Sequence, residues 1–455
     1  MTSYLFKNAL LVTMNPSREV FRGNVLVVND RIVDIKKADA QTGAATSSLS
    51  FEQGYAPEII EASRFAMLPG FVQTHIHLCQ TLFRNHAEDL TLLDWLRKKI
   101  WPFEAAHSES SMRVSAALGI AELLAGGSTT ILDMGSVQHY HAVFEEAERL
   151  GIRMAGGKCM MDAGEHVPTG LRETTEDSLR QSEALQAHWH GAARGRLRYA
   201  YAPRFALSCS ENLLCAVGER ARADSLMIHT HAAETAQEEE LLQKTKQERS
   251  IAFFKKLGIA GAHCCFAHGV QLHQGERETL AHDGTAIAHC PGSNAKLASG
   301  IAPVLELRRA GVKVGLGADG AACNNNLDMF HEMRLAGYLQ KLRHGANAFP
   351  SQQIVELATI GGAACLGWEN EIGSLEIGKK ADVILLNLEQ LHAAPANTEE
   401  IYAQIVYAAR AQDVYLTMVE GRILYQQGRF ADLDIEATLA QARQELQQLS
   451  ERVAL

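Results

Sequence analysis

Between about residue 66 and residue 370, short apolar runs alternate with amphipathic stretches. Examples in chain order are FVQTHIH, RVSAALGIAELLAGG, TTILDM, HAVFEEAERLG, LMIHTH, AHCCFAH, TAIAHC and VKVGLGAD. This alternation is typical of repeated βα units, and therefore of a parallel sheet. Roughly 300 residues of it predict an eight-fold α/β barrel, in which functional side chains lie at the C-terminal ends of the strands.

The two ends of the chain have a different pattern. Near the start, GNVLVVNDRIVDIKK places two β-rich runs around Asn29-Asp30, which predicts a strand, a turn and a second strand. Near the end, GSLEIGKKADVILLNL and VYLTMVEGRILYQQGRF again alternate β-branched residues with glycine turns. We therefore expect residues 1–65 and 371–430 to form one small β domain, with the barrel occupying 66–370.

The final segment, 431–455, has the spacing of an amphipathic helix. Its apolar residues follow one another at steps of three, four or seven, and they are Ile435, Leu439, Leu446, Leu449 and Val453. This spacing favours a helix packed on the body of the protein over a partner-binding zipper.

Charge and hydropathy argue against two classes of partner. The chain has 43 basic and 53 acidic residues, a net charge of −10, and no long basic run, so we expect no nucleic-acid partner. No apolar stretch approaches the roughly 20 residues that span a bilayer, and the start lacks the features of a signal peptide. We expect a cytoplasmic protein with no membrane partner. The nine scattered cysteines form no C-x-x-C pair, which predicts reduced, mostly buried thiols.

His75 and His77 follow the apolar run MLPGFV, so they are expected at the end of a strand. The two-residue period of a strand puts both imidazoles on one face, where they can bind one ion. A His-x-His pair is weak evidence by itself, because the chain has three others. The pair at 188–190 lies in a helical pattern, the pair at 139–141 leads into another helix, and the pair at 229–231 is strand-like.

Four further strand-like segments end in a potential metal ligand. They are LMIHTHAAE, HCCFAHG, AIAHCPGS and VKVGLGADG, which end at His231, His268, His289 and Asp319. Because the C-terminal strand ends of a barrel meet on one rim, these side chains are expected to lie together. Three neutral imidazoles and one carboxylate with an open position suit zinc or another borderline divalent ion. Separately buried histidines are the plain alternative, but several such polar groups are costly to bury without a shared role.

The chemistry expected of this site follows from the ion. Coordination lowers the pKa of water to about 7, so hydroxide becomes available near neutral pH. Asp319 can accept the proton of that water. Glu234, three residues after His231, can protonate a ring nitrogen beside the attacked carbon. His268 can stabilise the water or the charge that develops on addition.

These residues resemble the amidohydrolase superfamily, in particular its mononuclear aminohydrolase branch. The resemblance extends over nearly the whole chain and rests on LPGFVQTHIH, HAAET, the segment around His268, HCPGSNAKLASGIAP, GLGADGAACNNNLDMF and GSLEIGKKADVI. It implies a distorted (β/α)8 TIM barrel with a small β-sandwich domain formed from both termini. It also implies one divalent ion, zinc or sometimes iron, and a homo-oligomer, either a dimer or a tetramer.

Carried over position by position, the resemblance assigns two sets of residues. The implied metal ligands are His75, His77, His231 and Asp319. The implied proton shuttles are Glu234, His268 and Asp319.

Fewer residues bear on the substrate. THIHLCQ with Gln80, GKCMMD followed by RETTEDS, and APRFALSCS with Arg204 resemble guanine deaminases, in which the corresponding Gln and Arg hydrogen-bond the purine. Glu104, in WPFEAAH, occurs in both guanine and adenosine-type relatives. The first expectation is therefore guanine, or a close analogue, which metal hydroxide would convert to xanthine and ammonia.

Other segments favour an adenosine-type substrate. GADGAACNNNLDMFHEMRLA and HAAETAQEE are more similar to methylthioadenosine, S-adenosylhomocysteine and 5′-deoxyadenosine deaminases. In those relatives the position of Arg204 is usually His, and Lys158 corresponds to an Arg that binds the homocysteine carboxylate. Both differences argue against an S-adenosylhomocysteine pocket but leave smaller 5′-deoxynucleosides open. A triazine or pterin hydrolase is a third option. A non-catalytic scaffold is disfavoured because all four ligands are present.

Structural roles compete with substrate contact at three of these positions. Gln80 could cap the helix after the first barrel strand, and Arg204 could pair with a structural carboxylate. His289 could fix a loop instead of touching the substrate.

Overall fold

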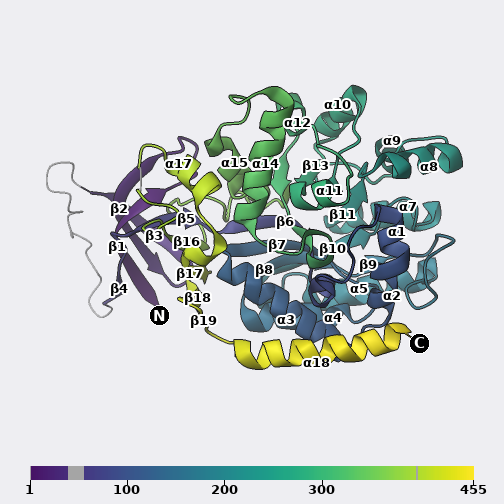
Figure 1. Ribbon diagram of the computed structural model, residues 1–455, viewed down its shortest axis with the longest axis horizontal. Helices are drawn as coiled ribbons and strands as arrows, with labels where there is room; N and C mark the ends of the chain where they lie inside the picture. Colours follow the sequence, from purple (N-terminus) through teal and green to yellow (C-terminus); the bar gives the residue numbers. More distant parts are fainter. Residues whose placement is uncertain (1, 39–55, 396–397, 455) are drawn as a thin grey trace.

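A closed barrel of eight parallel strands lies at the centre of the computed structural model, which describes residues 2–38, 56–395 and 398–454 (Figure 1). The barrel strands are β6 (Phe71–His77), β7 (Ser128–Met134), β8 (Arg153–Gly157), β10 (Leu197–Pro203), β11 (Met227–Ala232), β12 (Cys264–His268), β13 (Ala286–His289) and β14 (Val314–Leu316). β14 pairs with β6, and β10 pairs with β11, so the ring closes. This arrangement confirms the predicted (β/α)8 barrel.

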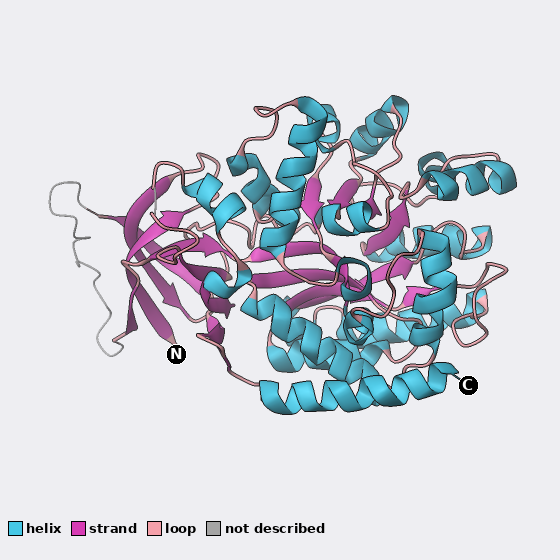
Figure 2. Cartoon of the chain, in the orientation of Figure 1, coloured by secondary structure: helices cyan, strands magenta, loops and turns pink. Residues whose placement is uncertain are grey.

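Helices fill the connections between the barrel strands and cover the outside of the barrel (Figure 2). They are α3 (Glu109–Ala125), α4 (Tyr140–Leu150), α5 (Thr175–Trp189), α6 (Ala192–Gly195), α7 (Glu211–Asp224), α8 (Ala236–Lys246), α9 (Ser250–Lys256), α10 (Gln274–Asp283), α11 (Pro291–Lys296), α12 (Val304–Ala310), α13 (Ala321–Asn324), α14 (Met329–His344), α15 (Ser351–Leu357) and α16 (Ile360–Cys365). Two short strands lie at the rim, β9 (Cys159–Met160) beside β10 and β15 (Asp319–Gly320) beside β6.

The longest connection on the C-terminal side of the barrel follows β6. It contains η1 (Leu78–Phe83), followed by α1 (Leu92–Trp95), η2 (Leu96–Ile100) and α2 (Trp101–Ala105). The last three run without a break along 92–105. Connections on this side of a barrel carry functional side chains, and a long one commonly covers the site.

Residues of β6 also fix the segment that precedes Asp319. β6 is buried along its whole length, as expected of a strand with helices on one side and the barrel interior on the other. Gln73 is a buried polar residue of this strand and therefore needs partners. Its Oε1 accepts a hydrogen bond from the Ala318 backbone N–H at 2.9 Å, and its Nε2 donates to the Leu327 carbonyl at 3.0 Å.

The two ends of the chain form one nine-stranded sheet beside the barrel (Figure 1). Its strands are β1 (Ser3–Val12), β2 (Val20–Val28), β3 (Arg31–Lys37), β4 (Glu58–Glu61), β5 (Phe65–Pro69), β16 (Val383–Asn387), β17 (Val414–Val419), β18 (Arg422–Gln426) and β19 (Arg429–Phe430). The hairpin predicted around Asn29-Asp30 is confirmed, since β2 and β3 pair antiparallel. The predicted boundary at residue 66 falls inside β5, and residues 39–55 lie outside the described part.

The two halves of this sheet meet where β5 pairs antiparallel with β16. The sheet has its own apolar core, which includes Phe6, Leu11, Val25, Leu385 and Leu416. Three short helical turns, α17 (Ile401–Ala403), η3 (Gln404–Ala408) and η4 (Ala411–Asp413), connect β16 to β17.

A buried ion network joins the barrel to the terminal sheet. Arg153 of β8 donates to both carboxylate oxygens of Asp382, at 2.8 and 3.1 Å, and lies 3.3 Å from Glu420. All three side chains are at most 3% exposed. Burial opposes the charge on Arg153, but the two carboxylates outweigh it and raise the pKa of the guanidinium.

The last helix, α18 (Ile435–Ala454), runs along α3 (Figure 1). Its buried face carries Thr438, Ala442, Glu445 and Leu449, while Leu439 is 42% exposed. Of the predicted apolar stripe, Leu449 is buried and Val453 packs against the core, whereas Leu439 lies outside the buried face. Among the described residues, no helix combines the length and the hydropathy that a membrane crossing requires.

Candidate active site

Four candidate ligands meet at one point of the barrel rim. His75 and His77 are on β6, His231 is on β11, and Asp319 begins β15 beside β6. One ligand atom from each residue lies within 4.8 Å of all the others. The Oδ1 atom of Asp319 is 3.3 Å from Nε2 of His75 and 3.3 Å from Nε2 of His77. The cluster predicted from strand ends is therefore assembled in space.

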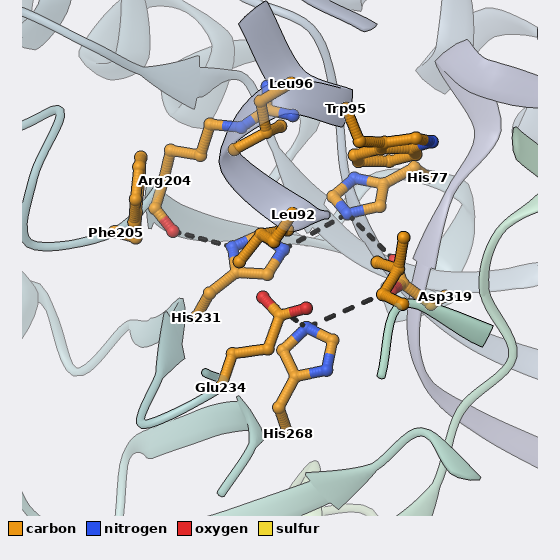
Figure 3. A pocket seen from close by; sticks show the side chains of 11 residues that line it. His77, Leu92, Trp95, Leu96, Arg204, Phe205, His231, Glu234, His268 and Asp319 are labelled. Carbon is orange, nitrogen blue, oxygen red and sulfur yellow. Dashed lines mark hydrogen bonds and ion pairs between the residues drawn. The ribbon is translucent and has the colours of Figure 1, made fainter. Parts of the chain in front are cut away.

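Backbone carbonyls fix the proton position on two of these imidazoles. Nδ1 of His77 is 2.7 Å from the Met134 carbonyl oxygen, and Nδ1 of His231 is 2.6 Å from the Arg204 carbonyl oxygen (Figure 3). A carbonyl oxygen only accepts hydrogen bonds, so each ring carries its proton on Nδ1. Each neutral ring consequently directs an unprotonated Nε2 toward the centre of the cluster.

The arrangement of these nitrogens fits a bound cation. Nε2 of His77 and Nε2 of His231 are 3.3 Å apart, but two unprotonated nitrogens cannot hydrogen-bond to each other. Nε2 of His75 is buried without a hydrogen-bond partner. Three nitrogen donors and one carboxylate around one point are the ligand set of a mononuclear zinc-type site with an open position. The residues present therefore fit the divalent ion that the sequence predicts.

Asp319 is ionised in this environment. Burial alone would raise its pKa, but the electrostatic effect of the neighbouring imidazoles of His75, His77 and His268 holds the pKa of the carboxyl well below its usual range. Its backbone is in the left-handed region, with φ of 61°, and Oδ1 accepts a hydrogen bond from the Gly320 N–H at 2.8 Å. Asp319 can thus act both as a ligand and as a proton acceptor.

Glu234 and His268 face this cluster from the neighbouring strand ends (Figure 3). Oε2 of Glu234 is 3.5 Å from Nε2 of His268, and that nitrogen is 3.9 Å from Oδ2 of Asp319. Burial, together with the negative charge of Asp319, raises the pKa of Glu234 to about 8. Nδ1 of His268 is 2.9 Å from Oδ1 of Asn294, which orients the ring. The carboxyl of Glu234 therefore holds a proton near neutral pH.

These polar groups form one wall of a cavity. Apolar side chains complete the lining and form an apolar wall: Leu92, Trp95, Leu96 and Phe205 are labelled in Figure 3, and Leu297 also lines the cavity. A cavity with one apolar wall and one chemically active wall suits a flat heterocycle, which can lie against the apolar side chains while its polar edge faces the reactive groups.

The chain is similar to known proteins along most of its length. The model of the "Amidohydrolase family" matches residues 66–424. The chain belongs to this family. It is 35% identical over 438 residues to a 5-methylthioadenosine/S-adenosylhomocysteine deaminase of Desulfitobacterium hafniense, with 96% of each chain covered. It is 34% identical over 455 residues to a 5′-deoxyadenosine deaminase of Methanosarcina mazei, with 100% of each covered.

Solved structures agree with this family. An adenosine deaminase from Xanthomonas campestris with bound zinc superimposes with a TM-score of 0.90 at 30% identity, covering 99% of each chain. The guanine deaminase of E. coli superimposes with a TM-score of 0.82 at 27% identity, covering 94% of this chain and 100% of the other. This amidohydrolase is a hydrolytic deaminase, an enzyme that acts on carbon–nitrogen bonds of cyclic amidines.

In this amidohydrolase, three of the residues expected to contact the purine, Gln80, Glu104 and Arg204, contact one another. Arg204 donates to both carboxylate oxygens of Glu104, at 2.6 and 3.2 Å, and Gln80 Nε2 donates to Oε1 of Glu104 at 3.0 Å. All three side chains are buried, and only Arg204 lines the cavity. Burial opposes the guanidinium charge, but Glu104 outweighs it and raises the pKa of Arg204.

The other two candidate substrate residues lie outside the lining of this cavity. The ammonium of Lys158 is buried and lies 2.6 and 2.7 Å from the carboxylate oxygens of Glu173. Its charge is therefore already paired. His289 ends β13 as predicted, is 1% exposed, and has no hydrogen-bond partner on either ring nitrogen within the described part of the chain.

Sequence reasoning missed the apolar wall and the residues that support the ligands. In the insertion after β6, Leu92 and Leu96 are four apart and Trp95 falls between them, which is the spacing of one helix face, but only Gln80 and Glu104 of this insertion were predicted as site residues. The length of that insertion was the available signal. His229 belongs to a strand-like His-x-His pair for which no role was inferred.

Proposed function

We propose that this amidohydrolase is a zinc-dependent deaminase of an adenosine-type substrate, of the 5′-deoxyadenosine or methylthioadenosine class. The reaction replaces the exocyclic amino group of the adenine ring with oxygen from water and releases ammonia. The observation that carries the substrate choice is the mutual pairing of Gln80, Glu104 and Arg204 beside the cavity.

This pairing engages part of the donor capacity that a guanine carbonyl would need. A guanine-binding pocket needs hydrogen-bond donors for the ring carbonyl, and a buried donor that is already satisfied costs free energy to redirect. The guanidinium of Arg204 and the amide N–H of Gln80 both donate to Glu104. An adenine ring has no carbonyl to satisfy and can use the apolar wall of the cavity. The full-length similarity to two adenosine-type deaminases supports the same choice.

The ligand set His75, His77, His231 and Asp319 would hold the ion. When bound there, zinc makes hydroxide available from water near neutral pH and polarises the reacting centre. The pairing of Lys158 with Glu173 removes the ammonium that would correspond to a carboxylate-binding group, so an S-adenosylhomocysteine tail is not part of the proposal.

The side chains of the chain supply the proton transfers. Glu234 is protonated near pH 7 and can donate to the ring nitrogen beside the attacked carbon. Asp319 is ionised and can accept a proton from the attacking water. The hydrogen bond from Nδ1 of His268 to Asn294 leaves Nε2 of His268 free to accept a second hydrogen bond from that water. Asp319 can then pass its proton to the amino group, the carbon–nitrogen bond breaks and ammonia leaves, while the hydroxyl proton of the adduct returns to Glu234 as the carbonyl forms.

Guanine is the second candidate, because Arg204 lines the cavity and the fold matches a guanine deaminase. The test is ammonia release by the zinc-loaded enzyme with 5′-deoxyadenosine, methylthioadenosine, adenosine, guanine, a pterin and a triazine at equal concentrations. We expect one of the first two to have a kcat/KM at least tenfold above that of guanine. Fastest release from guanine would overturn the adenosine-type proposal and leave the deaminase assignment intact.

A further inference from the structure

His229 lies on β11, two residues before the candidate ligand His231. The period of a strand puts both side chains on the same face, so His229 points into the barrel one layer below the metal site. Its side chain is completely buried. It belongs to none of the groups that line the cavity, and the proposed reaction gives it no proton to carry.

Two hydrogen bonds fix the ring of His229. Its Nδ1 is 2.8 Å from the Cys265 carbonyl oxygen on β12, and its Nε2 is 2.7 Å from Nδ1 of His75. The carbonyl can only accept, so Nδ1 of His229 carries a proton. In the neutral ring, Nε2 is then an acceptor, and the hydrogen between the two imidazoles sits on Nδ1 of His75. The hydrogen bonds run in one direction, from His75 through His229 to the backbone of β12.

We propose that His229 is a positioning residue that fixes the tautomer and orientation of His75, so that His75 offers its unprotonated Nε2 to the metal ion. This inference rests on the proposed metal site. Residues that accept the second N–H of a ligating histidine orient the ring and raise its basicity, and losing one commonly weakens metal binding 10–100-fold.

His75 differs from the other two imidazole ligands in this respect. His77 and His231 donate to backbone carbonyls, which no substitution can remove. His75 donates to a side chain. Removing His229 would leave Nδ1 of His75 without an acceptor and free the ring to protonate on Nε2, the atom that must stay unprotonated to bind the ion.

The experiment compares His229→Phe with His229→Gln. Phenylalanine keeps the ring shape but accepts no hydrogen bond, whereas the glutamine amide oxygen can accept from Nδ1 of His75. We expect His229→Phe to bind Zn²⁺ 10–100-fold more weakly than the wild type, measured by competition with a chromophoric chelator. His229→Gln should recover most of that loss. The matched control is His107→Phe, which removes another buried histidine that bridges a carbonyl and a side chain.

Folding and metal binding are measured separately. Thermal unfolding of the metal-free proteins identifies a variant that has lost its fold, and the Co²⁺-substituted proteins report ligand geometry by their visible spectra. A folded His229→Phe variant with wild-type Zn²⁺ affinity and an unchanged Co²⁺ spectrum would overturn the positioning role. Failure of the wild type to bind Zn²⁺ would instead overturn the proposed metal site.

Discussion

Replacing Glu234 with glutamine tests the proton donor at the centre of the proposed reaction. The side chain is 3% exposed and lies beside His268, so an isosteric amide can occupy the same space. Glutamine cannot give up a proton to a ring nitrogen. Because the change also removes a carboxyl that is costly to ionise in this environment, we expect the variant to fold as well as the wild type.

The size of the effect follows from the environment of the carboxyl. With its ordinary pKa of 4.5, Glu234 would be protonated in roughly one molecule in 300 at pH 7, but with a pKa of about 8 it is protonated in about nine of ten. Burial therefore raises the population of the active acid by a factor on the order of 300. General acids typically contribute about 10²–10⁴ to the rate. We expect kcat/KM of Glu234→Gln to fall by a factor in that range.

The assay is ammonia release by zinc-loaded protein over a range of pH. The wild-type kcat/KM should decline above about pH 8 as Glu234 loses its proton, and the residual activity of the variant should lack this decline. Glu445→Gln is the control, because Glu445 is also buried but lies on α18. A loss below tenfold in a folded variant with its full complement of zinc would refute the role of Glu234 as the acid.

Three further measurements test the ion, the buried network and a buried histidine. Treatment with a chelator should abolish activity. Zn²⁺ should restore it, whereas Mg²⁺, which prefers oxygen ligands, should not. Zinc at 100 times its Kd should also stabilise the fold by about 2.7 kcal/mol. Arg153→Met removes the cation that pairs with the buried carboxylate of Asp382, whereas Glu420 keeps Lys380, so the urea midpoint should fall by the equivalent of about 3–5 kcal/mol, while the exposed Arg180→Met should change little. Burial lowers the pKa of His107 from 6.5 to about 4. Between pH 4 and pH 6.5, the imidazole is therefore protonated in the unfolded chain but not in the folded one. Stability from this residue is therefore complete above pH 6.5 and falls by about 3 kcal/mol on acidification to pH 4. His107→Asn should flatten that part of the stability profile of the metal-free protein, and His282→Asn, at an 84% exposed side chain, should leave the slope in place.

The fold and the reactive groups could be predicted because both depend on local pattern. A barrel strand is a short apolar run that ends at the rim, so His77, His268 and Asp319 could each be placed from their own neighbours in the sequence. The rim then brings them together whatever their separation along the chain. The hairpin around Asn29-Asp30 could be predicted for the same reason.

Features that depend on packing between distant segments could not be predicted from the local sequence. The pairing of Arg204 with Glu104 joins residues one hundred positions apart, and nothing near either residue indicates the other. Lys158 is a candidate substrate contact from its sequence position, and its pairing with Glu173 likewise could not be predicted from its neighbours. Leu439 fits the expected stripe of its helix, yet its side chain is exposed, whereas Leu449 of the same stripe is buried. In each case the environment of the side chain is set by residues that are distant in the sequence.

The pairing of β5 with β16 has a consequence for biosynthesis. Pro69 lies opposite Val383, so one edge of the first half of the terminal sheet has no partner until roughly 300 more residues have left the ribosome, about 15–60 s at typical elongation rates. During that interval the nascent chain exposes an apolar strand edge of the kind that promotes aggregation. Strands separated by so large a loop pair slowly. The terminal sheet, which begins with the first strands to be synthesised, is therefore completed only by the last ones. Dependence on chaperones should therefore be greatest late in synthesis, and a truncation before β16 should accumulate as aggregate.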